Sequence, residues 1–130
     1  MLRFTGVSQE QLRKTEGVLV PIAPLSPEHL PHILAHLLAL SEHDRYLRFG
    51  YTATDAHIQR YVDNLNFERD EIYGIFNADL EIIAMAHLAL MKEPARESSG
   101  EFGVSVAAHA RGRGYGARLF ERAVIHARNE

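Results

Sequence analysis

A glycine-rich turn set among arginines is the part of this 130-residue sequence best suited to chemistry. Glycines have no Cβ, so the backbone N–H groups of such a turn can approach an anion closely. The arginines in and just after the turn add positive charge, and only Glu121 opposes them nearby. We therefore expect a phosphate-binding turn made of Arg111, Gly112, Arg113, Gly114, Tyr115, Gly116 and Ala117.

The turn joins a predicted strand to a predicted helix. In Glu101–Ala107 the apolar residues Phe102, Val104 and Val106 alternate with others, which is the spacing of a β-strand. After the turn, apolar residues recur at helical spacing, as Leu119, Phe120, Ala123, Val124 and Ala127. A helix that starts here directs the positive end of its dipole at the turn, which favours binding of a negative group.

Other phosphate-binding motifs fit less well. A P-loop needs Lys followed by Ser or Thr after its glycines, and no such pair follows them here. The dinucleotide fingerprint of a Rossmann fold matches loosely as Gly112-x-Gly114-x-x-Ala117. It also needs an acidic residue about 20 positions further on, whereas the sequence holds 13 residues after Ala117. An ordinary strand-to-helix turn with surface arginines stays open as an alternative.

Length and composition predict a single globular domain over residues 1–130. The absence of cysteine excludes a thiol nucleophile and a cysteine zinc site. A net charge of −3 argues against nucleic-acid binding, and no apolar run is long enough to predict a membrane span. The expected location, by default, is the cytoplasm. Residues 1–92 carry 8 Lys/Arg against 12 Asp/Glu and residues 93–130 carry 6 against 5, which suits an anionic cofactor at the turn.

Periodicity and turn residues predict the order of the remaining elements. Residues 1–17 show no clear period and are expected to be a lead-in or tail. A short strand at Val18–Ile22 is followed by a helix that begins at Ser26 and Pro27. The sequence then predicts a loop at Ser41–Thr54, a helix capped by Thr54, a hairpin of Glu71–Phe76 and Leu80–Met91, and a connection at Lys92–Gly100.

The turn and its context resemble the acyl-CoA signature of the GNAT superfamily of N-acetyltransferases, V-x-x-x-x-[QR]-x-x-G-x-[GA]. Every fixed position is met by Val106, Arg111, Gly114 and Gly116. The predicted order of strands and helices also matches that family through its third helix. The resemblance implies an α+β, three-layer α/β/α fold with a mixed, mostly antiparallel sheet, and a reaction that transfers an acetyl or other acyl group from acetyl-CoA to a primary amine by direct attack in a ternary complex.

A second, local resemblance lies in the predicted loop. Leu40-Ser41-x-x-x-Arg45-Tyr46-Leu47-Arg48-Phe49 is similar to the L-S-x-x-S-R-Y-x-R-F segment of GNAT domains related to bacterial protein-lysine acetyltransferases, with Asp44 in place of the usual serine. In the family this loop borders the acceptor site, which implies acceptor contacts for Arg45, Tyr46 and Arg48. The alternative is a connection packed for stability, with its arginines paired to acids such as Asp44.

The resemblance also implies roles for individual residues of the strand and the turn. The pantetheine arm of coenzyme A would pair with the backbone of Val104, Ser105 and Val106, and the Val106 N–H would polarise the thioester carbonyl. The pyrophosphate would bind to Arg111–Ala117. Glu101 is the candidate general base, and a solvent-exposed carboxylate at a strand end is the alternative.

The eight histidines give no strong metal signal. His32 and His36 have the i,i+4 spacing of a metal pair, but no H-E-x-x-H pattern or third ligand accompanies them. The sequence therefore predicts no metal, and it predicts that His29, His32 and His36 form a polar helix face. His87 is expected either in an acceptor cleft or in a core gap, and His109 is expected to be exposed.

In full-length family members further strands and a fourth helix follow the third helix, so we expect an incomplete GNAT domain whose Glu101–Ala107 strand is an unprotected sheet edge. Such an edge, or the last helix, would support a homodimer. The alternative function is a non-catalytic CoA-binding or dimerisation module, and a structural use of the fold without CoA is the third. Neither a nucleic acid nor a membrane is expected as a partner.

Overall fold

A five-stranded sheet lies at the centre of the computed structural model, which describes residues 2–5, 21–91 and 99–129. The strand order is β1-β5-β4-β3-β2. All neighbouring strands run antiparallel except β1 and β5, which are parallel. The strands are β1 (Leu2–Thr5), β2 (Ala23–Pro24), β3 (Glu71–Phe76), β4 (Ile82–Met91) and β5 (Ser99–Val106).

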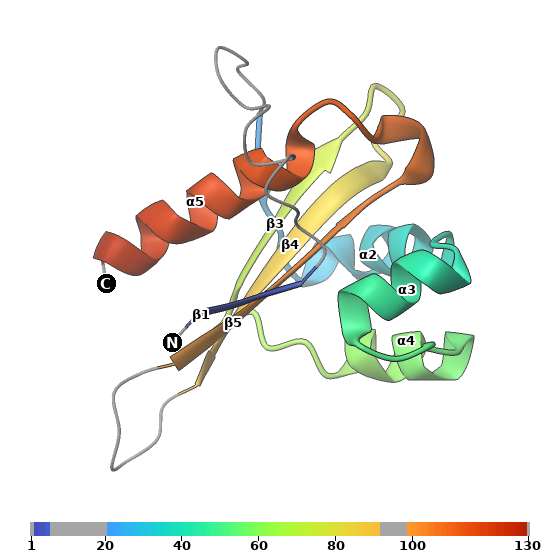
Figure 1. Cartoon of the computed structure of the whole chain (residues 1–130), viewed down its shortest axis with the longest axis horizontal. Helices are drawn as coiled ribbons and strands as arrows, with labels where there is room; N and C mark the ends of the chain where they lie inside the picture. Colours follow the sequence, from blue (N-terminus) through green and yellow to red (C-terminus); the bar gives the residue numbers. More distant parts are fainter. Residues whose placement is uncertain (1, 6–20, 92–98, 130) are drawn as a thin grey trace.

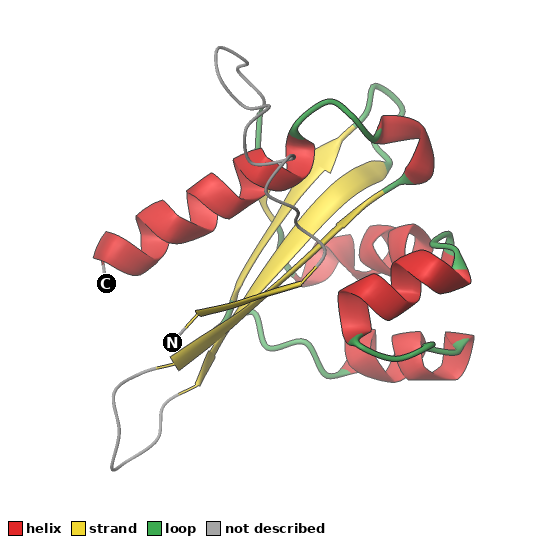
Figure 2. Ribbon diagram, viewed as in Figure 1, coloured by secondary structure: helices red, strands yellow, loops and turns green. Residues whose placement is uncertain are grey.

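Helices cover the two faces of the sheet unequally (Figures 1 and 2). The long helix α5 lies on one face, and α2, α3 and α4 lie on the other. The helical segments are η1 (Pro27–His29), α2 (Leu30–Leu38), α3 (Glu42–Phe49), α4 (Asp55–Asp63), η2 (Ala108–Ala110) and α5 (Tyr115–Asn129). No helix within the described ranges is both long and apolar enough to cross a membrane. The α+β, three-layer fold class predicted from the sequence is confirmed.

Alternation along the strands creates two separate cores. On β5, Phe102 and Val104 face α5 and pack with Leu119 and Ala123 of that helix. The opposite face of the sheet packs against α2 and α4 in a second cluster that includes Ile33, Leu37, Ile58, Ile72 and Met85. The side chains of Glu101 and Ser105 therefore point towards α2, α3 and α4, and Gly103 lies on the same face.

Capping residues fix where the helices begin. Thr54 accepts a hydrogen bond from the His57 N–H and His57 Nδ1 accepts one from the Thr54 N–H, which closes a capping box on α4. Ser26 and His29 form the equivalent box before α2, whose first turn is a 3₁₀ segment with proline at its start. The predicted helices after Ser26 and Thr54 and the hairpin of β3 and β4 are confirmed, with β4 beginning at Ile82 instead of Leu80.

The predicted loop at Ser41–Thr54 is wrong, because most of it forms helix α3. Ser41 caps this helix by accepting from the Asp44 N–H, and Gly50 ends it in the left-handed region at φ 83°. Apolar periodicity does not reveal α3 because Arg48 is its only buried residue. The helix is held by polar contacts instead of an apolar stripe.

Arg45 provides most of those contacts. Its guanidinium donates to the backbone carbonyls of Leu38, Leu40 and Ala53 at 2.8–3.1 Å, and it pairs with Asp55 at 2.9 Å. Two of the three carbonyls belong to the end of α2 and the turn after it, where helix geometry leaves carbonyls without partners. Arg45 therefore joins α2, α3 and the start of α4.

The prediction of an unprotected edge is wrong for the first half of β5. Residues 2–5, expected to be a lead-in or tail, form β1 and pair with Gly100–Gly103. The register ends at Thr5 and Gly103, so Val104–Val106 has no strand on its outer edge within the described ranges. Most of the predicted strand at Val18–Ile22 and connection at Lys92–Gly100 falls outside those ranges, and β2 and β5 begin at Ala23 and Ser99. A homodimer through the edge or α5 stays a prediction.

Replacing Arg45 tests this anchor. We expect Arg45→Met to lower the free energy of unfolding by about 2–3 kcal/mol, because two half-buried carbonyls and one exposed carbonyl lose a charged donor. Asp55→Asn is the matched control and should cost less than about 1 kcal/mol, since the Asp55 side chain is 80% exposed. Urea unfolding measures both. Equal losses in the two variants would show that the ion pair, not the carbonyl contacts, holds α3.

Candidate functional site

The outer edge of β5 presents a backbone N–H group close to the glycine-rich turn. The Ala107 N–H donates to the Ile83 carbonyl of β4 at 2.8 Å. Because N–H groups alternate between the two sides of a strand, the N–H groups of Val106 and Val104 point away from β4, towards the edge. Both lie beyond the described β1 register, which ends at Gly103, and Val106 is the farther of the two from it. An extended ligand can therefore pair with the edge at Val106.

The turn after β5 has the conformation of an anion-binding loop. Gly112 and Gly114 both have φ 80°, a region that residues with a side chain rarely adopt. A Cβ placed on Gly112 would meet no atom within 4 Å, so the backbone there is open to approach from outside. At Gly116 the first turn of α5 packs near the Val106 side chain, where a Cβ would lie 3.8 Å from Cγ2. The turn thus connects the free edge of β5 to the start of α5.

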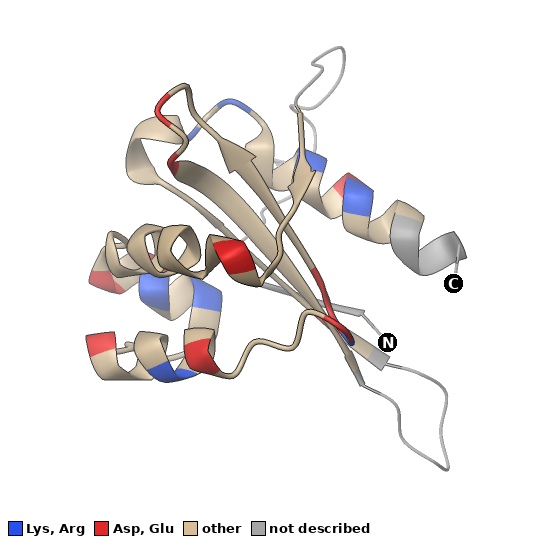
Figure 3. Cartoon of the chain, turned by 180° about the vertical axis from the view of Figure 1, so that it is seen from behind, with Lys and Arg blue, Asp and Glu red and all other residues tan. Residues whose placement is uncertain are grey.

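Positive groups surround this turn (Figure 3). Arg113 is exposed, and Arg111 forms an ion pair with Asp44 of α3. Within the described residues, Arg118 Nε is the buried side-chain nitrogen that has no hydrogen-bond partner, although its Nη1 pairs with Glu121 at 3.2 Å. A buried N–H without a partner is costly, so an anion at the start of α5 would supply what Arg118 lacks. The turn therefore fits a pyrophosphate.

Glu101 lies near the other end of β5, where β1 pairs with it. It is half-buried on β5, opposite Ala89 of β4 and Arg3 of β1 in the sheet register. Alternation directs its side chain to the face covered by α2, α3 and α4, as predicted. Val106 lies five residues further along β5, about 16 Å from Glu101.

A glycine on β5 makes room for a buried arginine. Arg48 of α3 is only 8% exposed and lies flat on Gly103, where a Cβ would come within 2.3 Å of its Cζ. The guanidinium stacks on the rings of Phe49 and Tyr61, with Cζ 4.8 and 5.3 Å from their centroids. Sequence reasoning named Arg48 but missed Gly103, although a glycine inside a strand is a known sign of a close approach.

Arg48 begins a chain of hydrogen bonds that ends at a buried carboxylate. Its Nη2 donates to the Tyr61 hydroxyl at 2.8 Å, and Tyr61 lies 2.5 Å from His87 Nδ1. His87 Nε2 lies 2.8 Å from Asp70 Oδ2. Burial alone would raise the pKa of Asp70. Hydrogen bonds from Arg69, His87 and the Leu90 N–H outweigh this effect and hold the pKa of Asp70 below its usual value.

These partners fix which atom carries each proton. The ionised Asp70 carboxylate only accepts, so His87 Nε2 must donate to it. Burial lowers the pKa of His87, so the ring is neutral at pH 7 and its Nδ1 accepts from the Tyr61 O–H. Burial also raises the pKa of Tyr61, which keeps the phenol protonated. The sequence predicts His87 either in an acceptor cleft or in a core gap, and in the structure it lies in the packed interior.

His36 forms a second buried polar contact on the same face, so the predicted polar helix face is wrong at this position. Its Nδ1 lies 3.0 Å from the Ile82 carbonyl and its Nε2 lies 2.8 Å from Ser105 Oγ. A carbonyl only accepts, so Nδ1 carries the proton and Nε2 accepts from the serine hydroxyl. Burial is the main cause that lowers the pKa of His36 to about 4. His32 and His109 are exposed.

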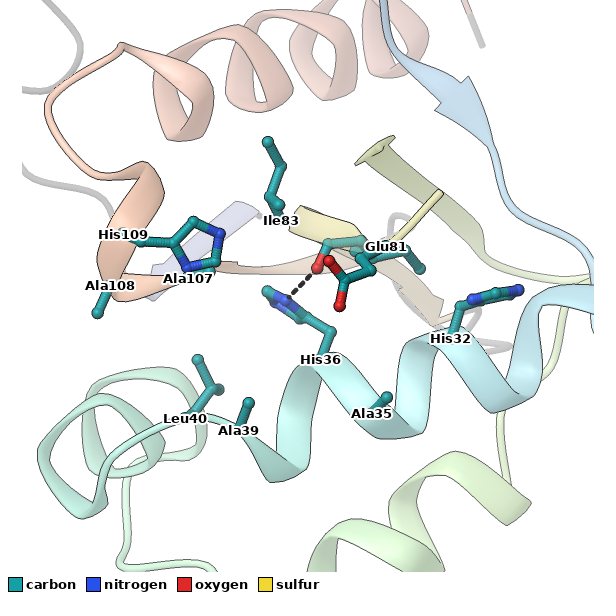
Figure 4. Close-up of a pocket in the computed structure, with 11 residues that line it drawn as sticks. His32, Ala35, His36, Ala39, Leu40, Glu81, Ile83, Ala107, Ala108 and His109 are labelled. Carbon is teal, nitrogen blue, oxygen red and sulfur yellow. Dashed lines mark hydrogen bonds between the residues drawn. The ribbon is translucent and has the colours of Figure 1, made fainter. Parts of the chain in front are cut away.

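A pocket of about 240 Å³ adjoins His36, between α2, the start of β4 and the segment that follows β5. Figure 4 shows its lining, with His32, Glu81 and His109 as the other ionisable side chains. Alanines and aliphatic side chains form the rest of the wall. Within the described residues, no three His, Cys, Asp or Glu side chains are placed to bind a metal ion.

The predicted acceptor residues are not equivalent in the structure. Arg45 is occupied by backbone carbonyls and Asp55, and Tyr46 is 54% exposed. Arg48 alone reaches β5, on the face that Glu101 and Ser105 share. Asp44, expected to pair with an arginine of its own segment, pairs instead with Arg111 of the turn.

The sequence model of the Acetyltransferase (GNAT) family matches residues 35–130. No curated protein matches the sequence.

Solved structures share the fold at low sequence identity. The GNAT domain of S. lividans PAT superposes with a TM-score of 0.63 at 19% identity, over 83% of this chain and 65% of that one. For the ribosomal-protein-alanine N-acetyltransferase from Brucella melitensis, the TM-score is 0.62 at 21% identity, over 85% and 68%. A possible acetyltransferase from Clostridium difficile 630 gives 0.65 at 14%, over 87% and 74%. The chain thus spans less than two thirds of the S. lividans domain.

The buried, neutral state of His36 predicts a loss of stability in acid. The unfolded chain binds a proton to this histidine near pH 6.5, whereas the folded chain does so only near pH 4. Stability should therefore be intact above about pH 6.5 and fall as the pH decreases towards 4, by about 3 kcal/mol from this group. Urea unfolding between pH 7.5 and about 4.5 measures the slope.

His36→Gln is the variant for this test, and exposed His32→Gln is its control. We expect the first to be less stable at pH 7.5 and to show a shallower pH dependence, with the remainder due to His87. A His36→Gln slope equal to that of the parent would rule out His36 as a source of the acid sensitivity.

Proposed function

Because the chain belongs to the acetyltransferase (GNAT) family, we propose that it transfers an acetyl or other acyl group from acetyl-CoA to a primary amine, by direct attack in a ternary complex. The observation that carries this proposal is the continuity of two binding features. The N–H of Val106, which points to the edge of β5 beyond the described β1 register, leads directly into a turn with two glycines at φ 80° and the start of α5.

The turn and the edge would hold different parts of acetyl-CoA, which supplies an activated acyl thioester when bound. The pyrophosphate belongs at Arg111–Ala117, where backbone N–H groups, the helix dipole and Arg118 Nε favour negative charge. Arg111 would then exchange its partner Asp44 for a phosphate, or share the two. The pantetheine arm would pair with the backbone of Val104, Ser105 and Val106 as an added strand.

Two N–H groups can polarise the thioester carbonyl. The Val106 N–H is clear of β1, but Glu101 is about 16 Å away along the strand, so a base there would act through a chain of waters. The Val104 N–H also points to the edge and lies about 10 Å from Glu101, which needs a shorter chain of waters, although it borders the part of the edge that β1 covers. In either case Glu101 would take the proton that the attacking amine loses.

The amine would approach from the face covered by α2, α3 and α4, because Glu101, Gly103 and Ser105 turn towards that side. Arg48 and Tyr61 form the wall there, and Arg45 holds that wall in place. A non-catalytic CoA-binding or dimerisation module is the alternative function, and release of free CoA in the presence of an amine separates it from an enzyme.

Binding of acetyl-CoA should raise the melting temperature of the protein. Ligand at about 100 times its Kd stabilises the folded state by about 2.7 kcal/mol, which is roughly 10 °C for a domain of this size. The double variant Arg111→Ala, Gly114→Ala should lose this shift, because it removes a cation and forces a Cβ onto a residue at φ 80°. A thermal-shift titration measures both.

Arg122→Ala on α5 is the matched control for charge, since Arg122 is exposed and stacks on Tyr73 away from the turn. It should keep the full shift. If the parent shows no shift at millimolar acetyl-CoA, or if the double variant keeps the shift while folded, the turn is not the CoA site.

Replacing Glu101 tests the base. Glu101→Gln keeps the size of the side chain and removes the proton acceptor, so we expect kcat to fall about 10²- to 10⁴-fold with little change in the acetyl-CoA thermal shift. Turnover is followed by free thiol release over a panel of amines. Glu81→Gln, exposed on the β3–β4 turn, serves as the control. A Glu101→Gln rate within threefold of the parent would remove Glu101 from the mechanism.

A further inference from the structure

We propose that Arg48 recognises a carboxylate on the substrate, so that the acyl transfer proposed above acts on a primary amine, or an acyl group, that carries one. This inference rests on the proposed function. It adds the chemical class of the molecule that occupies the face of β5 between Glu101 and Ser105.

The hydrogen bonding of Arg48 is the first observation. An arginine side chain has five N–H donors, and Nη2 of Arg48 donates to the uncharged Tyr61 hydroxyl at 2.8 Å. Its Nε and Nη1 bond to no described residue. In the described ranges, Arg118 Nε is the side-chain atom that is both fully buried and without a hydrogen-bond partner. Nε and Nη1 of Arg48 also lack partners there, so solvent must reach them. Because Nη2 carries two N–H groups and Tyr61 accepts from one of them, one bidentate edge of the guanidinium, either Nε with Nη2 or Nη1 with Nη2, keeps both of its donors.

The charge of Arg48 is the second observation. The residue is 92% buried, and none of the ion pairs formed within residues 2–5, 21–91 and 99–129 includes it. Arg45 and Arg69 differ, because Arg45 pairs with Asp55 and Arg69 pairs with Asp70. A buried cation is normally paired. A carboxylate that binds the open side of the fork in a bidentate manner would complete this arrangement.

The rigid placement of Arg48 is the third observation. Stacking on Phe49 and Tyr61 fixes the plane of the guanidinium, and Gly103 lets it lie directly on the backbone of β5. The hydrogen bond to Tyr61 is itself held by His87 and Asp70. An arginine restrained by these contacts loses little freedom when it binds an anion, which is the property of a preorganised recognition group.

The position of Gly103 sets the expected length of the substrate. Gly103 and Val106 are three residues apart, about 10 Å along the strand. With the thioester carbonyl at Val106, the amine and the carboxylate must be separated by several methylene groups, as in 6-aminohexanoate or the side chain of free lysine. With the carbonyl at Val104, a short amino acid such as glycine would fit. The preferred chain length therefore reports which N–H group polarises the carbonyl.

Matched pairs of substrates test the proposal in the full 130-residue chain. With acetyl-CoA as donor, glycine, 4-aminobutyrate and 6-aminohexanoate are compared with the alkylamines of the same chain length. A second arm compares succinyl-CoA with butyryl-CoA, each with hexylamine, because the carboxylate can also come from the acyl group. We expect kcat/KM to be about tenfold or more higher for the carboxylate member of at least one pair.

Three variants assign the preference to Arg48. In Arg48→Gln the ratio between the members of that pair should fall to about one, and in Arg48→Lys, which keeps the charge without the fork, it should be intermediate. Arg60→Gln, exposed on α4, should keep the parent ratio. If Arg48→Gln does not fold, Arg48→Lys still decides, because an unchanged ratio there contradicts bidentate binding.

The proposal is overturned if alkylamines react and no pair in either arm shows a preference, or if the preference survives in Arg48→Gln. If no amine is acylated at all, the proposed function fails, and calorimetric titration with 6-aminohexanoate and with glutarate decides the inference separately. A carboxylate site is supported if either compound binds the parent and does not bind the Arg48 variants. It is rejected if the millimolar compounds bind the parent and the variants equally, or bind neither.

Discussion

The antiparallel register of β4 against β5 is the constraint on which the site depends. The bond from the Ala107 N–H to the Ile83 carbonyl fixes which N–H groups of β5 face β4 and which face the edge. The same register turns Phe102 and Val104 into the core under α5 and turns Glu101, Gly103 and Ser105 towards the other helices. A shift by one residue would exchange both sets at once, so the edge and the polar face are specified together.

Polar contacts hold the face opposite α5 as much as apolar packing does. Arg45, Arg48 and His36 each join separate elements, and each uses a partner that can only accept or is uncharged. Because His36 and His87 are buried and neutral, the proton on each ring has a fixed place. This order has an energetic cost in acid, and it gives a rigid surface beside β5 on which a substrate can be recognised.

Sequence reasoning found the elements whose signal is local. The Thr54 cap with Ile58 and Val62, the hairpin of β3 and β4, and the turn that follows β5 are all encoded within a few residues. Helix α3 was missed because a helix with one buried arginine has no apolar period, and β1 because a four-residue parallel pairing is visible only in three dimensions. His36 was misplaced for the same reason, since its partner Ser105 is 69 residues away.

Amide resonances of an ¹⁵N-labelled sample titrated with acetyl-CoA test the central claim most directly, that the edge of β5 and the glycine-rich turn form one binding surface. The account predicts that the Val106 amide proton moves downfield as it gains a carbonyl or pantetheine partner, together with shifts at Gly112, Gly114 and Ala117. Resonances of His32 and Ala35, on the α2 side of the pocket beside His36, should change little. Saturable shifts confined to that pocket, or a Val106 resonance that stays in place while the turn responds, would contradict it.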